Sequence, residues 1–230
     1  MNILLIETAT QVCSVALAID GHIAARRESD TPNAHSTSLS VFIDEVLNEC
    51  RLHYGDLSAL CVSSGPGSYT GLRIGVSSAK GVCYALDIPL LSAPTLLSMA
   101  ALYYRQHPGY QGMVCPMIDA RRMECYTMLV GSGLVVLRDT SADIIEKGLY
   151  DEYLNAGEVV FVGDGAAKTC DLIGSHPNAR YDETFLPSAE GLLPIALNRL
   201  RLGQMEDVAY FEPFYLKDFI AKKSVVHGLR

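Results

Sequence analysis

The chain has 230 residues, of which 49% are hydrophobic, with a formal net charge of −8 and a pI near 5.2. This composition supplies one large core or two small ones and excludes a disordered chain. The acidic balance disfavours stand-alone RNA binding, because a phosphate backbone is met mainly by Lys and Arg. No apolar stretch approaches the length of a membrane span, and the seven cysteines include no CxxC pair. We therefore expect a cytoplasmic protein with reduced thiols and no membrane partner.

The first half of the chain alternates strand and helix patterns. Three strands joined by short turns are predicted over 2–7, 12–19 and 22–28. They are followed by a helix over 36–52, a strand over 57–64, a helix over 69–86, a short strand near Leu90 and a helix over 94–105. The predicted order is therefore βββαβαβα.

The second half repeats the first at a shift of 112 positions. The aligned pairs include Ile6 with Ile118, Glu7 with Asp119, and Cys13 with Cys125. Apolar matches arise easily by chance, but the turn residues and strand edges coincide as well. The repeat predicts strands over 113–118, 124–130 and 134–138, then a helix over 142–155, a strand over 158–163, and helical patterns over 165–173 and 188–203.

A glycine- and proline-rich loop joins the strand over 57–64 to the helix that follows it. We call it the signature loop, and its residues are Gly65, Pro66, Gly67, Ser68, Tyr69, Thr70, Gly71 and Arg73. A capped helix N-terminus beside glycines can hold a phosphate. However, the loop lacks the Lys of a P-loop, and its GxGxxxG spacing misses the dinucleotide pattern by one residue. From the spacing alone we favour a structural turn that lets a helix approach its neighbour closely.

Four segments of the chain together resemble one family. They are ETAT at 7–10, GPGSYTGLRIG at 65–75, IDARRMECY at 118–126 and PFYLKD at 213–218. Over nearly its full length the chain is similar to the TsaB (YeaZ-like) family. This family is the non-catalytic dimerisation subunit of the bacterial machinery that attaches a threonylcarbamoyl group to the adenosine beside the anticodon of ANN-decoding tRNAs. The resemblance implies a Gcp-like domain of the actin, Hsp70 and sugar-kinase (ASKHA) superfamily.

The duplicated element order and the resemblance predict the same fold class. We expect an α/β protein of two ribonuclease-H-like lobes, each with a mixed sheet of three antiparallel strands plus crossover strands, flanked by helices. The N-terminal lobe is placed at 1–108 and the C-terminal lobe at 109–230, with QHPGYQG at 106–112 as the hinge. The segment after Ser188 can cross back to the first lobe, and Pro194 fits a helix there only near its start or at a kink.

In this superfamily ATP lies between the lobes, held by an acidic hairpin from each lobe and a glycine-rich turn. The matching residues here are Glu7, Thr8, Asp119, Arg121, Gly163 and Gly165. Both carboxylates are present, but neither hairpin has the glycine that lets a backbone approach a phosphate. We therefore expect at most a contact with a nucleotide or a partner in this cleft. No cofactor is required, although ATP or ADP at a subunit interface is compatible with the sequence.

The sequence predicts no metal site and no catalytic residue. The catalytic relatives of this family carry an HxxxH pair on the helix that corresponds to 36–52. Here His35 is followed four positions later by Leu39, so the second His is absent. No GxSxG elbow occurs either. The expected role is therefore that of a non-catalytic subunit.

The helices over 36–52 and 69–86 offer a candidate partner surface. The first carries an apolar stripe, and the second adds a face of small residues that permits close helix packing. Internal packing against the sheet would explain the small face equally well, and the resemblance decides for a partner. The predicted interface comprises Leu39, Phe42, Ile43, Val46, Leu47, Cys50, Leu72, Gly75, Val76, Ser78, Ala79 and Val82.

The resemblance also implies the partners. These are a TsaD-like catalytic subunit and a TsaE-like ATPase, with a homodimer when the chain is alone and with tRNA reached only through the complex. The competing function is an active small-molecule kinase or ATPase of the same superfamily, with Asp119 as its candidate general base. A stand-alone RNA-binding module is a third function, which the acidic composition disfavours.

Overall fold

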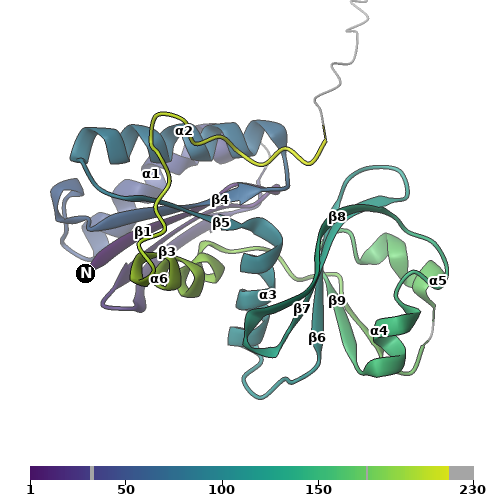
Figure 1. The fold of residues 1–230 in the computed structure, drawn as a ribbon. Helices are drawn as coiled ribbons and strands as arrows, with labels where there is room; N and C mark the ends of the chain where they lie inside the picture. Colours follow the sequence, from purple (N-terminus) through teal and green to yellow (C-terminus); the bar gives the residue numbers. More distant parts are fainter. Residues whose placement is uncertain (32–33, 175, 218–230) are drawn as a thin grey trace, which may run out of the picture.

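Two five-stranded mixed sheets form the two lobes of the protein (Figure 1). The computed structural model describes residues 1–31, 34–174 and 176–217. The strand order is β3-β2-β1-β4-β5 in the first sheet and β8-β7-β6-β9-β10 in the second. The orders are the same when each lobe is numbered from its own first strand, so the predicted two-lobed α/β fold class is confirmed.

The first lobe follows the predicted order of elements. The antiparallel strands are β1 (Asn2–Glu7), β2 (Cys13–Ile19) and β3 (His22–Ser29), and the parallel additions are β4 (Ala59–Gly65) and β5 (Leu90–Pro94). The connecting helices are α1 (Ala34–Glu49), the 3-10 turn η1 (Tyr54–Asp56) and α2 (Tyr69–Leu86). Helix α3 (Thr95–Gln106) then leads into the second lobe.

The second lobe repeats the three antiparallel strands but has shorter helices. Its strands are β6 (Met113–Asp119), β7 (Glu124–Gly131), β8 (Val135–Ile144), β9 (Val159–Val162) and β10 (Ala179–Asp182). Its helices are η2 (Ser132–Leu134), α4 (Asp151–Ala156), η3 (Ala167–Thr169) and α5 (Cys170–Ile173). The four residues of β10 are too few to show a strand period, and this strand was not predicted.

The prediction of a helix over 142–155 is wrong, because β8 continues to Ile144 and α4 begins only at Asp151. Asp143 explains the difference. Its carboxylate is 8% exposed and accepts hydrogen bonds from both terminal nitrogens of Arg138, at 2.5 and 2.7 Å. The hydroxyl of Thr127 on β7 donates to the same carboxylate at 2.5 Å. This polar network between β7 and β8 keeps the segment in the sheet.

The segment after Ser188 returns to the first lobe. The short turn η4 (Ala189–Leu192) and helix α6 (Leu193–Arg201) pack on the first sheet. Leu192 belongs to the same buried hydrophobic cluster as Leu5 and Ala16 of that sheet. Pro194 stands at the start of α6, where its missing N–H loses no helical hydrogen bond. Residues 203–217, which we call the strap, then run along α2 as the yellow segment of Figure 1.

The first sheet is covered on both faces. Because successive side chains of a strand point to opposite faces, Leu4 and Ile6 pack under α1 and α2, whereas Leu5 packs under η4 and α6. Helix α3 packs mainly on the second sheet, where Met99 meets Val114, and it lies between the two sheets in Figure 1. The fold therefore places the ends of β1 and β6 beside the space between the lobes.

Candidate functional site

A cleft of about 730 Å³ opens between the two lobes. The first lobe contributes Ala9, Thr10 and the residues 67–70 of the signature loop, and the second lobe contributes the β6–β7 turn at 119–122. The strap adds residues 215–217. Since β1 and β6 occupy equivalent positions in their sheets, the duplication brings the two predicted hairpins to one cleft.

The signature loop sets α2 directly against the end of β1. The Ser68 hydroxyl caps α2 by accepting a hydrogen bond from the Gly71 N–H at 3.3 Å, and the Ser68 N–H donates to the Ala9 carbonyl at 2.6 Å. A side chain at Gly71 or at Gly75 would collide with Thr8. These two glycines therefore serve the close approach of helix and strand, as the structural interpretation of the loop requires.

The strap fixes the other side of the signature loop. The Phe214 N–H donates to the Ser64 carbonyl at 2.7 Å, and a side chain at Gly65, where φ is 109°, would meet the Phe214 carbonyl. Tyr69 packs on Tyr215 with ring centroids 4.7 Å apart. Of the remaining loop residues, Pro66 is buried, and Gly67 and Thr70 line the cleft. The Arg73 guanidinium lies 4.9 Å from the Tyr69 ring centroid.

Glu7 is a buried carboxyl at the end of β1. One of its oxygens accepts a hydrogen bond from the Ala9 N–H at 2.7 Å, and the other has no partner among the described residues. Complete burial raises the pKa of Glu7 to about 7, although the Ala9 N–H opposes this shift. The Thr8 hydroxyl is likewise buried without a partner among the described residues. Both side chains are closed off from the cleft, which corrects the expectation that they contact a nucleotide or partner there.

In the second hairpin, the acidic residue Asp119 forms an ion pair within the chain. Asp119 accepts hydrogen bonds from the Lys168 ammonium at 2.5 Å and from the Arg121 N–H at 2.6 Å. Although partial burial acts to raise it, these donors hold the pKa of Asp119 below its ordinary value. Lys168 also donates to the carbonyls of Arg122 and Glu124. The ammonium therefore neutralises Asp119 and fixes the turn, which makes Asp119 a poor general base at neutral pH.

The β6–β7 turn carries two consecutive arginines with left-handed backbone. The φ angles are 72° at Arg121 and 53° at Arg122, and both residues are exposed and line the cleft. Behind the turn, an Asp164 oxygen accepts a hydrogen bond from the Asp119 N–H at 2.9 Å, and burial raises the pKa of Asp164. The turn thus brings two guanidinium groups to the second-lobe side of the cleft.

Gly163 and Gly165 form a turn that packs on β6. The Gly165 N–H donates to the Met117 carbonyl at 3.1 Å. A side chain at Gly163 would meet that carbonyl and the end of Met99, and one at Gly165 would meet Cys125. Neither glycine lines the cleft. In this structure both glycines serve internal packing, and the expected nucleotide contact stays a prediction.

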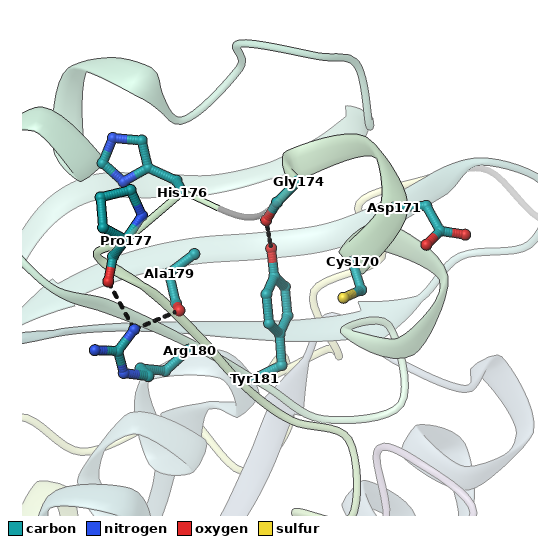
Figure 2. A pocket seen from close by; sticks show the side chains of 8 residues that line it. All are labelled: Cys170, Asp171, Gly174, His176, Pro177, Ala179, Arg180 and Tyr181. Atoms are coloured by element: carbon teal, nitrogen blue, oxygen red, sulfur yellow. Dashed lines mark hydrogen bonds between the residues drawn. The ribbon is translucent and has the colours of Figure 1, made fainter.

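A second hollow of about 650 Å³ lies at the outer edge of the second sheet, between α5 and β10 (Figure 2). Its polar groups are mostly engaged within the chain. Arg180 donates to the carbonyls of Pro177 and Ala179, and the Tyr181 hydroxyl donates to the Gly174 carbonyl at 3.2 Å. This hollow therefore offers no convergent set of ligand groups.

Two kinds of feature are absent from the part of the chain that the structure describes. It holds no group of three or more His, Cys, Asp or Glu side chains that could bind a metal ion. Nor does it hold a helix long and apolar enough to cross a membrane.

The lone histidine before the predicted helix over 36–52 has a contact within the chain. His35 lies within hydrogen-bonding distance of the Val12 carbonyl, with Nε2 at 3.2 Å.

The interface predicted on α1 and α2 consists largely of core residues. Leu39, Ile43, Val46, Leu47, Leu72, Gly75, Val76 and Ala79 are buried within the lobe. These side chains pack against their own sheet, because the apolar stripe of an amphipathic helix faces the core, and their burial argues against the predicted contact with a partner. The other predicted residues, Phe42, Cys50, Ser78 and Val82, are half-buried.

A different set of α1 and α2 residues faces outward. The exposed set includes charged side chains such as Asp44, Glu45 and Arg73. We call its small and apolar members the outer face: Ser40, Val41, Ser77, Gly81 and Tyr84. Val41 is 48% exposed and Tyr84 is 84% exposed. Unlike Gly71 and Gly75, Gly81 has nothing within 4 Å of the position that a Cβ would take. The outer face therefore combines small residues with two exposed apolar side chains.

Sequence reasoning missed two lysines that organise the cleft. Lys168 pairs with Asp119, and Lys217 at the end of the strap forms an ion pair with Glu124 of β7. Each contact joins segments that are far apart in the chain, so the sequence does not show which acidic residue either lysine meets. The motif PFYLKD, whose last residue lies outside the described part of the chain, was the one signal that pointed to the strap.

Two duplicated lobes around a cleft define a protein with the actin-like fold. A family model described as "TsaD: tRNA N6-adenosine threonylcarbamoyltransferase" matches residues 29–224. The chain is 33% identical over 232 residues to the tRNA threonylcarbamoyladenosine biosynthesis protein TsaB of Escherichia coli, covering 98% of both chains. It is 36% identical to the Bacillus subtilis protein of the same name, over 56% of this chain and 55% of that one.

The solved structures agree with these relatives. YeaZ from Pseudomonas aeruginosa superposes with a TM-score of 0.82 at 26% identity, covering 94% of this chain and 99% of that chain. The chain therefore belongs to the TsaD-type family and, within it, to the TsaB (YeaZ-like) proteins.

Proposed function

We propose that this chain is a non-catalytic scaffold subunit in tRNA threonylcarbamoyladenosine biosynthesis. It pairs through the outer face of α1 and α2 with a TsaD-like catalytic subunit, and a TsaE-like ATPase joins the pair. Alone, the chain forms a homodimer through the same face, and it reaches tRNA only through the complex. It requires no cofactor. Membership of the TsaB family, whose curated members are named for this biosynthesis, supports the pathway.

The pairing proposal rests on the position of Gly81 in α2. A glycine within a helix costs about 0.5–1 kcal/mol relative to alanine, so a glycine in α2 needs a reason. Thr8 supplies that reason for Gly71 and Gly75, but among the described residues nothing outside the helix's own backbone lies within 4 Å of the position that a Cβ at Gly81 would take. A partner helix that approaches the outer face closely would explain it, because small residues let helix axes come together.

The chemistry of the cleft supports a non-catalytic role. Asp119 is the candidate base for the competing kinase or ATPase function, and Lys168 already neutralises it. The first hairpin offers no replacement, because Glu7 is fully buried. A kinase would need an accessible carboxylate that can accept a proton from a substrate hydroxyl.

Three substitutions test the pairing face. Gly81→Leu should abolish the homodimer and co-purification with a TsaD-like subunit, whereas Gly81→Ala should weaken both less, because its added side chain is a single methyl. Asn198→Leu, at another exposed helical position on α6, is the matched control and should leave pairing intact. Light scattering after gel filtration and affinity capture of the catalytic subunit are the measurements. A Gly81→Leu variant that still pairs like the control would refute the face assignment.

A further inference from the structure

The first part of the strap is held by α2. The Lys80 ammonium donates to the carbonyls of Ala209 and Phe211, at 3.1 and 2.9 Å. Asp207 folds this stretch into a turn by accepting hydrogen bonds from the N–H groups of Ala209 and Tyr210, at 2.8 and 3.2 Å. One side chain of α2 therefore fixes the position of this turn.

The end of the strap crosses from the first lobe to the second. Tyr215 packs on Tyr69 at the start of α2. Two residues later, Lys217 forms an ion pair with Glu124, and its ammonium lies 5.9 Å from the Tyr126 ring centroid. Glu124 and Tyr126 belong to β7 of the second lobe, and all five side chains line the cleft. Among the described residues, Lys217 and Glu124 supply the ion pair that joins the strap to the second lobe.

The lobes have a second junction at α3 and η4. Glu190 of η4 forms ion pairs with Arg26 of β3 at 3.0 Å and with Arg105 of α3 at 3.8 Å. Helix α3 lies between the two sheets in Figure 1, whereas the strap runs along α2 and ends beyond it, on the side of the second lobe. A rotation of the lobes about α3 would preserve this junction but would separate Lys217 from Glu124.

We infer that the strap is a latch that holds the two lobes closed over the cleft, and that α2 sets its position through Lys80. The latch is suited to reversible opening. The Lys217 and Glu124 side chains are 37% and 23% exposed, so water screens their attraction. A partly exposed ion pair shifts an equilibrium by about two- to five-fold, which biases the lobes towards closure without locking them.

The latch also connects the cleft to the partner face. Lys80 lies one helical turn before Tyr84 of the outer face, so a partner on that face would restrict the segment that holds the strap. Partner binding should therefore favour the closed latch. This coupling between partner binding and the latch rests on the proposed function, whereas the latch itself does not.

A single introduced fluorophore can report on the latch. The chain has no tryptophan, so Tyr215→Trp places one at the contact with Tyr69. In this background, Lys217→Glu and Glu124→Lys should each shift the ratio of closed to open forms by at least about two-fold, and acrylamide should quench the fluorophore more strongly. The double variant restores opposite charges and should return quenching to the starting level. Lys147→Glu, at an exposed position away from the cleft, is the matched control.

The outcomes separate the latch from the proposed function. Unchanged quenching in both single variants, or a double variant that is not restored, would overturn the latch, while thermal unfolding checks that each variant is folded. Lys80→Met should raise quenching as Lys217→Glu does, and no change would overturn the role of α2. Adding the TsaD-like subunit should lower quenching. If it binds without lowering quenching, the coupling fails, whereas if it does not bind, the proposed function fails.

Discussion

The buried carboxyl of Glu7 makes the stability of the protein depend on pH in an unusual direction. Most carboxylates in folded proteins have pKa values that are ordinary or lowered, so acid destabilises the fold. Glu7 is fully buried, and its pKa is raised from the ordinary value of 4.5 to about 7. Glu7→Gln replaces it with a neutral side chain of nearly the same shape and removes this titration.

The size and sign of the effect follow from the raised pKa. Each unit of pKa difference corresponds to about 1.4 kcal/mol, so the shift to about 7 represents roughly 3 kcal/mol. Because the folded pKa lies above the unfolded one, the contribution is complete below pH 4.5 and is lost as the pH rises through 7. Between pH 5 and pH 8, the wild type should lose about 2–3 kcal/mol of unfolding free energy that Glu7→Gln retains.

Urea unfolding of both proteins at several values between pH 5 and pH 8 measures this difference. Glu183→Gln, which removes an exposed carboxyl of the second lobe, is the control and should follow the wild type at every pH. The reasoning would be refuted by parallel curves for the wild type and Glu7→Gln, since a constant offset would mean that Glu7 does not titrate in this range.

Two further substitutions test the packing described above. Gly75→Ala should destabilise the protein by about 1–3 kcal/mol despite the better helix propensity of alanine, because the new methyl meets Thr8, whereas Gly81→Ala should stabilise the monomer by about 0.5–1 kcal/mol. Chemical unfolding at low protein concentration distinguishes the two, and equal effects would contradict the different surroundings of these glycines. Asp143→Asn should cost about 2–4 kcal/mol, because Arg138 loses its charged partner, and a change under 1 kcal/mol in the unfolding free energy would contradict a supporting role for the network.

The sequence predicts most of the first lobe because its local signals agree with its tertiary structure. Strand alternation, the turn residues and the Ser68 cap all point to the elements that the structure contains. The second lobe is harder to predict, because the end of β8 depends on Asp143 finding Arg138 and Thr127 within the sheet. A window over 142–155 shows only a helical pattern, and those polar partners lie outside it.

The candidate site was likewise predictable from the sequence only in part. The motifs located the two hairpins and the signature loop, but the direction in which a helical stripe points is decided by packing. Val46 and Val76 have the spacing of an interface and are core residues, whereas Gly81, one of the small residues of the predicted helix over 69–86, lies on the outer face. Lys168 and Lys217 act across segments that only the folded chain brings together.

Reconstituted threonylcarbamoyl transfer to tRNA tests the central proposal most directly. The reaction would contain the synthase of threonylcarbamoyl-adenylate, a TsaD-like subunit and a TsaE-like ATPase, with or without this chain, alongside ATP hydrolysis by the chain alone. The scaffold proposal predicts transfer only when the chain is added and no hydrolysis by the chain itself. Transfer that is independent of the chain, together with ATP turnover by the pure protein, would contradict it and favour the kinase or ATPase alternative.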